Sequence, residues 1–180
     1  MAGRQGASRR CRADAGLIAV PLTNPSVQRV QAALRAAGSG AAVVALAETA
    51  RSAQEAADSV GCALGAIVKS LVFEVEGQAV MVLVAGDRRC NEKALPAALG
   101  LTGKARRASP ELVREATGFA IGGVSPVGHP GKLAIGIDAS LGRFDAIYAA
   151  AGHPHCVFAT TPDELQRITG GIVSEVVAKA

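Results

Sequence analysis

The chain has 180 residues, of which 49% are hydrophobic, 19% charged and 3% aromatic. This length favours one domain, and the apolar share is too high for a disordered chain. The longest apolar run, residues 79–85, is far shorter than the roughly 20 residues of a membrane-spanning helix, so we expect a soluble protein with no membrane partner.

The charge is unevenly distributed along the chain. Lys and Arg number 19 against 15 Asp and Glu, a net charge of +4, but residues 1–22 hold four arginines and one aspartate, which leaves the rest nearly neutral. Global charge therefore indicates no particular partner. Two local clusters are either solvated surface or, if they face one cleft, phosphate-binding sites. They comprise Arg88, Arg89 and Lys93, and Lys104, Arg106 and Arg107.

The cysteines stand at positions 11, 62, 90 and 156, without Cys-x-x-Cys spacing. This pattern is neither a disulfide framework nor a zinc ribbon, and free thiols favour a reducing, cytoplasmic compartment. His153, His155 and Cys156 are metal ligands by type but lack a fourth partner at a helpful spacing, so we expect no metal and no cofactor. We also expect residues 1–24 to be a flexible leader and residues 25–180 to form a single domain.

In chain order, the first predicted helix begins at Asn24-Pro25-Ser26 and ends at Gly38. A short buried strand over residues 42–46 follows. Ser52 and Glu55 then form a capping box, in which each side chain satisfies an unpaired amide at the start of a helix that ends near Gly61.

The middle of the chain predicts a β-hairpin. Residues 67–75 and 79–85 are strands joined at residues 76–78. A broken helical segment over residues 91–99 follows, with a proline that begins its second turn. Residues 109–118 form a further helix, because Ser-Pro-Glu opens it and a glycine ends it.

The last third is typical of short strands between Gly and Pro loops. A second capping box at Thr161 and Glu164 opens a helix that ends at Gly170, and residues 172–177 are either a strand or a helix. Because hairpins and helix-linked strands are intermixed, we expect an α/β fold with a mixed sheet. The predicted strands of this part cover residues 119–121, 133–138, 145–149 and 156–159.

Lys69 is the most informative single residue. It lies in an otherwise apolar strand, Ile67-Val68-Lys69-Ser70-Leu71-Val72-Phe73, on the face that carries residues 67, 71 and 73. An ammonium there either extends to solvent along its methylene stem or points into a cleft. In a cleft, burial lowers its pKa and allows it to bind phosphate or carbonyl groups or to donate a proton.

Two loops rich in glycine and proline are candidate substrate contacts. Gly122-Gly123-Val124-Ser125-Pro126 follows a predicted strand and can present main-chain amides and carbonyls to a small polar group. Gly152-His153-Pro154 is a similar candidate. Each loop is also compatible with an ordinary connection, and neither alone identifies a function.

Taken in order, these segments resemble the YbaK-type aminoacyl-tRNA deacylases, a family related to the editing domain of bacterial prolyl-tRNA synthetases. The ordered pair of strand lysine and Gly-x-x-x-Pro loop is the most specific part of the resemblance, which runs from about residue 25 to about residue 175. The segments that carry it are residues 50–57, 67–73, 84–89, 117–126 and 161–165.

The resemblance implies an α/β domain with a mixed, barrel-like sheet surrounded by helices, and a cleft for the aminoacylated 3′ end of a tRNA. It implies that Lys69 is the catalytic residue, which holds the phosphate of the terminal adenosine or polarises the ester. The backbone of Gly122 to Pro126 would contact the aminoacyl group. His153-Pro154 would correspond to a His-Pro pair that helps set side-chain size in some relatives, so Gly152 and His153 would also contact the substrate. Family members often lack a protein nucleophile, so water or a substrate group would attack the ester.

The expected function is trans-editing, the hydrolysis of mischarged tRNA, namely proline tRNA that carries Ala, Cys or Ser. We expect no cofactor, with prolyl-tRNA synthetase as a further partner. A non-catalytic module that binds tRNA ends or a protein, and a hydrolase of a small aminoacyl ester or nucleotide, remain alternatives. The residues expected to bind the tRNA are Arg88, Arg89, Lys104, Arg106 and Arg107.

The chain departs from its relatives at two places. Some relatives carry an aromatic residue on the first strand, where this chain has residues 43–46 with none. YbaK itself has a basic Gly-rich turn where this chain has Gly152-His153-Pro154-His155. Both differences leave the accepted amino acid open, but neither touches Lys69 or the loop that ends at Pro126.

Overall fold

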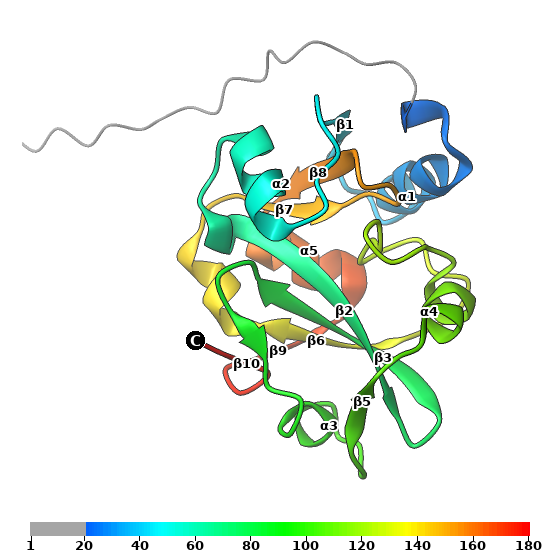
Figure 1. The fold of residues 1–180 in the computed structure, drawn as a ribbon, viewed down its shortest axis with the longest axis vertical. Coiled ribbons are helices and arrows are strands. Elements are labelled where there is room, and N and C mark those ends of the chain that lie inside the picture. Colours follow the sequence, from blue (N-terminus) through cyan, green and yellow to red (C-terminus); the bar gives the residue numbers. More distant parts are fainter. Residues whose placement is uncertain (1–20) are drawn as a thin grey trace, which may run out of the picture.

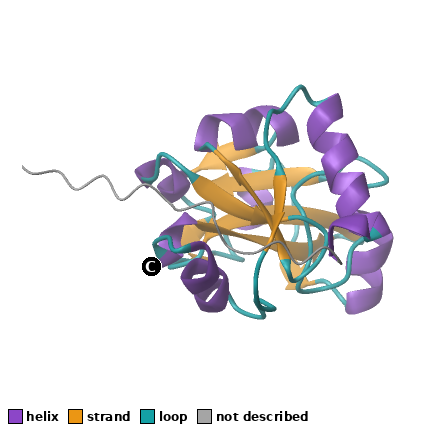
Figure 2. Cartoon of the chain, turned by 90° about the horizontal axis from the view of Figure 1, so that it is seen from above, coloured by secondary structure: helices purple, strands orange, loops and turns teal. Residues whose placement is uncertain are grey.

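The computed structural model describes residues 21–180, which form a large mixed sheet with helices around it (Figures 1 and 2). Eight strands make this sheet in the order β1-β8-β7-β2-β3-β6-β9, with β5 also paired to β2, and β4 and β10 form a second small sheet. The strands are β1 (Val43–Ala45), β2 (Ile67–Val75), β3 (Gln78–Ala85), β4 (Arg89–Cys90), β5 (Ala105–Arg107), β6 (Ala134–Asp138), β7 (Ile147–Ala150), β8 (Cys156–Thr160), β9 (Ile172–Ser174) and β10 (Ala178–Lys179).

Four of the five α-helices within residues 21–180 begin at the predicted capping residues, whereas the predicted helical segment over residues 91–99 is an α-helix only at Leu95–Ala98. Side chains of Asn24, Ser52, Ser109 and Thr161 accept main-chain N–H groups in the first turns of α1, α2, α4 and α5. The α-helices are α1 (Pro25–Ala36), α2 (Ala53–Val60), α3 (Leu95–Ala98), α4 (Pro110–Thr117) and α5 (Pro162–Thr169), and the short 3₁₀ helices are η1 (Pro21–Thr23), η2 (Leu64–Ala66) and η3 (Ala139–Arg143).

The β2–β3 hairpin stands at the centre of the sheet. Its turn residues Glu76 and Gly77 have positive φ angles of 48° and 79°, as a tight two-residue hairpin turn requires. The parallel pairs β2–β7, β3–β6 and β6–β9 stand beside antiparallel ones, so the prediction of a mixed sheet in an α/β fold is confirmed.

Apolar side chains cover both faces of β3. Met81 and Leu83 join a core that includes residues of α1, α4 and α5, whereas Val80 and Val82 join a second core with α3. A strand buried on both faces reads as a continuous apolar run, which explains residues 79–85. No helix within residues 21–180 combines the length and apolarity needed to cross a bilayer.

Several predicted elements differ in the structure. Residues 119–121 form a turn instead of a strand, because the chain reverses at Gly122 (φ 98°), while Phe119 buries its ring against the core. Residues 172–177 form the short strand β9 and an irregular segment. The strand over residues 42–46 is only half buried, since Val44 is 50% exposed.

The packed domain includes residues before position 24. Pro21–Thr23 forms η1, and Leu22 packs against the larger core. These residues of the expected leader therefore belong to the packed domain. The remainder of the expected leader, residues 1–20, lies outside the described residues.

Candidate active site

A cavity of about 400 Å³ lies on the free edge of β2. Its walls come from β2, β7, β8, the start of α2, α4 and the loop after α4. The predicted residues Lys69, Gly122, Val124 and His153 all line it, together with Arg107. The structure therefore brings the strand lysine and both Gly-Pro loops to one site, as their proposed roles require.

The cavity occupies a gap between two strands that pair with the same edge of β2. β7 pairs with Ile67 and Val68, and β5 pairs with residues 73–75. Between them, no strand of the described chain pairs with this edge. In this gap, main-chain N–H and C=O groups of β2 face the cavity and can hydrogen-bond to a bound ligand.

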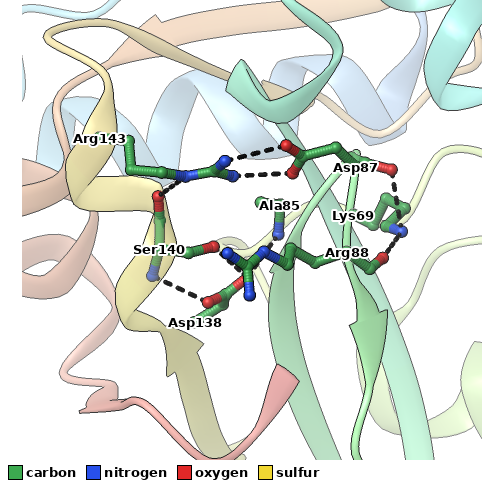
Figure 3. Close-up of polar contacts among 8 residues, drawn as sticks. Lys69, Ala85, Asp87, Arg88, Asp138, Ser140 and Arg143 are labelled. Carbon is green, nitrogen blue, oxygen red and sulfur yellow. Dashed lines mark hydrogen bonds and ion pairs between the residues drawn. The ribbon is translucent and has the colours of Figure 1, made fainter. Parts of the chain in front are cut away.

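Lys69 is held by the turn after β3. Its ammonium donates hydrogen bonds to the main-chain oxygens of Gly86, at 3.2 Å, and of Arg88 (Figure 3). Burial lowers the pKa of Lys69, an effect that the negative charges of Asp87 and Asp138 oppose. An ammonium has three N–H donors, so two fixed carbonyls leave one for a ligand. The side chain neither extends freely to solvent nor lies loose in the cleft.

An ion pair fixes the turn that holds Lys69. The Arg143 guanidinium contacts both carboxylate oxygens of Asp87, at 2.8 and 3.0 Å, and this hydrogen bonding lowers the pKa of Asp87. Gly86 approaches η2 so closely that a Cβ there would lie 2.1 Å from the main-chain oxygen of Leu64. The turn thus depends on contacts from two other segments.

The buried carboxylate of Asp138 stabilises the end of β3 beside this turn. It accepts the main-chain N–H of Ala85 at 3.1 Å and that of Ser140 at 2.8 Å (Figure 3). These bonds join β3 to η3, the element that carries Arg143. The position of Lys69 is therefore set by contacts spread over three segments of the chain.

The loop of residues 122–126 divides into a ligand-facing part and a buried part. Gly122 and Val124 line the cavity, whereas Ser125 and Pro126 are buried and lie outside its lining. The ring of His129 donates from Nε2 to the Ser125 oxygen at 2.8 Å, and burial lowers the pKa of His129. The sequence predicted substrate contacts from all five residues of the loop, but only Gly122 and Val124 line the cavity.

The two predicted loops pack backbone against backbone. A Cβ on Gly123 would lie 2.9 Å from both N and Cα of His153, and one on Gly152 would lie 2.8 Å from the Ser26 oxygen. The His153 ring stacks on His155, with centroids 5.4 Å apart. Burial and the adjacent His155 lower the pKa of His153. The glycines are needed because no side chain fits between these segments.

The basic residues predicted to bind tRNA differ in where they lie relative to the cavity. Arg107 lines the cavity, and its Nε lies 3.8 Å from a carboxylate oxygen of Glu92, the residue before Lys93. Arg106 and Lys104 are exposed. Arg89 is exposed opposite Lys179 in the β4–β10 pair, while Arg88 contributes its carbonyl to Lys69.

Ser70, which the sequence pattern did not single out as a site residue, also lines the cavity. Its Oγ is buried without a hydrogen-bond partner in the described structure. A signal was present, since Ser70 is a polar residue between Val68 and Val72 on one face of the strand. Arg51 and Tyr148 were missed as well and line the same cavity.

Residues 47–168 match the family model of the aminoacyl-tRNA editing domain. The chain is 37% identical over 117 residues to YwhH, an uncharacterised protein of Bacillus subtilis, and this match covers 64% of the chain and 73% of that protein. It is 45% identical over 65 residues to the proline–tRNA ligase of Moorella thermoacetica, a match that covers 36% of the chain and 11% of the ligase.

A solved structure agrees over nearly its whole length. It is described as a candidate trans-editing enzyme for prolyl-tRNA synthetase, and it superposes with a TM-score of 0.78 at 44% identity, covering 86% of this chain and 98% of that one. Fold, cavity and matches together define a hydrolase of aminoacyl esters. The chain belongs to the aminoacyl-tRNA editing domain family, whose activity is deacylation of aminoacyl-tRNA.

Proposed function

We propose that the protein acts in trans on proline tRNA that carries Ala, Cys or Ser. The observation that carries this proposal is the 400 Å³ cavity that unites Lys69, Gly122 and His153. Its volume lies in the range of sites for small ligands, which is the size of a terminal nucleoside with a short amino acid. The similarity to a structure described as a candidate trans-editing enzyme for prolyl-tRNA synthetase supports the choice of tRNA.

The walls of the cavity favour a small aminoacyl side chain. Val68, Val72, Val113, Val124 and Val157 supply short apolar surfaces. An apolar pocket separates side chains that differ by one methylene by about 1–3 kcal/mol, so several small residues remain acceptable to it. This property suits an enzyme that clears more than one small amino acid from the same tRNA.

Lys69 is the catalytic residue of the proposal. The third N–H of its ammonium binds a phosphate oxygen of the acceptor end or the ester carbonyl. Main-chain groups at Gly122 and Val124 position the aminoacyl group. None of the described residues that line the cavity is Asp or Glu. In this proposal water attacks the ester carbonyl, and the bond to the ribose oxygen breaks, which releases the free amino acid and the ribose hydroxyl of the tRNA.

The tRNA acceptor end approaches over the basic residues beside the cavity. Arg107 lies at the lining, and Arg89 and Arg106 are exposed nearby on β4 and β5. Phosphate contacts from such residues supply affinity without reading sequence. Selection of the proline tRNA then falls to prolyl-tRNA synthetase as a partner or to contacts beyond the acceptor end.

The test is deacylation of purified proline tRNA charged with Ala, Cys, Ser or Pro. We expect catalytic clearance of at least one of the three mischarged forms and survival of the Pro form. Gly122→Val, which places a branched side chain at φ 98° beside Pro154, should lower the rate about 100-fold. Survival of all three mischarged forms, with clearance of another aminoacyl-tRNA, contradicts the choice of substrate.

A further inference from the structure

The gap in the sheet leaves one residue of β2 with its main-chain groups directed into the cavity. The Val72 oxygen accepts a hydrogen bond from the Ala108 N–H at 3.3 Å, so Val72 faces the β5 edge. Alternate residues of an antiparallel strand present both their N–H and C=O to the same edge. Ser70 therefore presents both groups to this edge, where neither β5 nor β7 pairs with it.

The side chain of Ser70 also points to a ligand at the gap between β5 and β7. Its Oγ is buried and has no hydrogen-bond partner among the described residues. An unsatisfied buried hydroxyl is uncommon and costs free energy unless a ligand or water satisfies it. Ser70 lines the cavity and is only partly buried as a residue, so rotation about its Cα–Cβ bond turns the hydroxyl toward a bound molecule.

The chemistry of the other lining residues decides what Ser70 binds. An aminoacyl ester carries an α-ammonium group, which needs hydrogen-bond acceptors. No carboxylate is present in the described lining, and its charged side chains are the cations Arg51, Lys69 and Arg107. These cations suit the phosphates of the acceptor end and repel an ammonium. The ammonium is therefore best placed at neutral acceptors whose side chains lie on the face of β2 opposite to that of Lys69.

We propose that Ser70 recognises the α-ammonium of the aminoacyl ester through its main-chain oxygen and its hydroxyl, both acceptors. The assignment rests on the deacylase function proposed above and adds the residue that orients the aminoacyl group within the site. The side chain of the substrate then lies against Val68 and Val72, which flank Ser70 on the same strand face. Recognition of the α-ammonium is independent of which small amino acid is attached.

The experiment measures binding of two stable analogues by calorimetry. One is adenosine whose ribose 3′ position carries an L-alanyl amide, and the other carries the L-lactyl amide, in which a hydroxyl replaces the amino group. We expect the wild-type protein to bind the alanyl analogue about 10–100-fold more tightly, because hydrogen bonds to charged groups are strong. Ser70→Ala should reduce this preference about tenfold, and Ser70→Thr, which keeps the hydroxyl, should retain it.

Matched controls distinguish loss of α-ammonium recognition at Ser70 from a general disturbance of the fold. Ser59→Ala, on the exposed side of α2 and outside this cavity, should leave both affinities unchanged. Ser70→Ala should melt at or slightly above the wild-type temperature, because it removes an unsatisfied hydroxyl. Equal affinity of the wild-type protein for the two analogues overturns the proposal, as does binding of neither. A Ser70→Ala variant that loses both affinities in parallel also overturns it.

Deacylation assays, combined with analogue binding, distinguish an error in the role of Ser70 from an error in the choice of tRNA substrate. If the wild-type protein clears none of the three mischarged proline tRNAs but prefers the alanyl analogue, and Ser70→Ala reduces that preference, the substrate assignment fails and the role of Ser70 stands. If it clears one of them while Ser70→Ala retains the full analogue preference, the function stands and the role of Ser70 fails.

Discussion

The ammonium of Lys69 donates a hydrogen bond to the main-chain oxygen of Gly86 at 3.2 Å, which ties the first half of β2 to the turn after β3. This turn is itself held by the Asp87–Arg143 ion pair. The position of the candidate catalytic group therefore depends on a residue of η3, which is 56 positions from Asp87 in sequence.

Loss of this ion pair should affect activity more than stability. Both side chains are more than a third exposed, 40% for Arg143 and 35% for Asp87, so the pair contributes less than about 1 kcal/mol to folding. Asp87→Asn should lower the deacylation rate about 10–100-fold, because small displacements of a catalytic group are costly. Chemical denaturation and single-turnover kinetics measure the two effects. A rate loss matched by a large loss of stability would contradict this separation.

The close contact between the loop of residues 122–126 and His153 predicts that adding one methyl group at Gly123 lowers both stability and activity. Gly123→Ala places a Cβ 2.9 Å from the His153 backbone, so the loops must separate. We expect a loss of about 1–3 kcal/mol of stability and a rate at least about tenfold lower. Gly131→Ala is the matched control, since a Cβ there meets nothing within 4 Å. Equal behaviour of the two variants in thermal melts and kinetics would show that the loop contact is unimportant.

Secondary structure was largely predictable because its signals are local. Capping side chains at Ser52 and Ser109, and glycines that adopt positive φ, mark helix ends within a few residues. The prediction failed at residues 119–121, where apolar side chains signal burial without a strand. Phe119 packs under the guanidinium of Arg29, 4.5 Å from the ring centroid, a tertiary contact that no local pattern contains.

The main residues of the candidate site were predictable from the sequence, but the contacts that position them were not. The residue pattern singled out Lys69 and the two loops, the resemblance supplied their expected roles, and the structure brings them together. The carbonyls that hold Lys69 and the gap that exposes Ser70 depend on the pairing of β2 with β5 and β7 and on the turn at Gly86. Pairing of distant strands is a tertiary property, so the sequence alone did not show them.

His129 predicts a loss of stability in mild acid. Its Nε2 donates to the Ser125 oxygen, and burial lowers the pKa of the ring below its ordinary value of 6.5. The unfolded chain therefore binds a proton more readily than the native protein does. The contribution of His129 is fully present above pH 6.5 and is lost as the pH falls from 6.5 toward the lower native pKa.

Urea unfolding at a series of pH values measures this effect. We expect His129→Gln, whose side-chain amide also donates, to reduce the loss of stability in acid. Some pH dependence should remain, because burial also lowers the pKa of His153. An unchanged pH profile in His129→Gln would contradict the assigned role of this ring.

The basic residues beside the cavity predict a salt dependence of tRNA binding. Each phosphate contact on a single strand contributes a slope of about −0.7 in log K against log salt. Arg107→Gln should weaken binding and reduce the magnitude of that slope by about this amount, because Arg107 lines the cavity. Lys132→Gln, in the exposed segment before β6, is the control and should change neither. A slope unaffected by Arg107→Gln would remove this residue from the tRNA path.

The catalytic role of Lys69 is tested by multiple-turnover deacylation with the wild-type protein and with Lys69→Ala. With mischarged proline tRNA in excess, the wild-type protein should clear the substrate, and Lys69→Ala should be at least about 100-fold slower, because it removes a charge that acts on the ester or its phosphate. Circular dichroism and melting confirm that the variant is folded. Wild-type-like turnover by folded Lys69→Ala would contradict the central claim that this ammonium carries the chemistry.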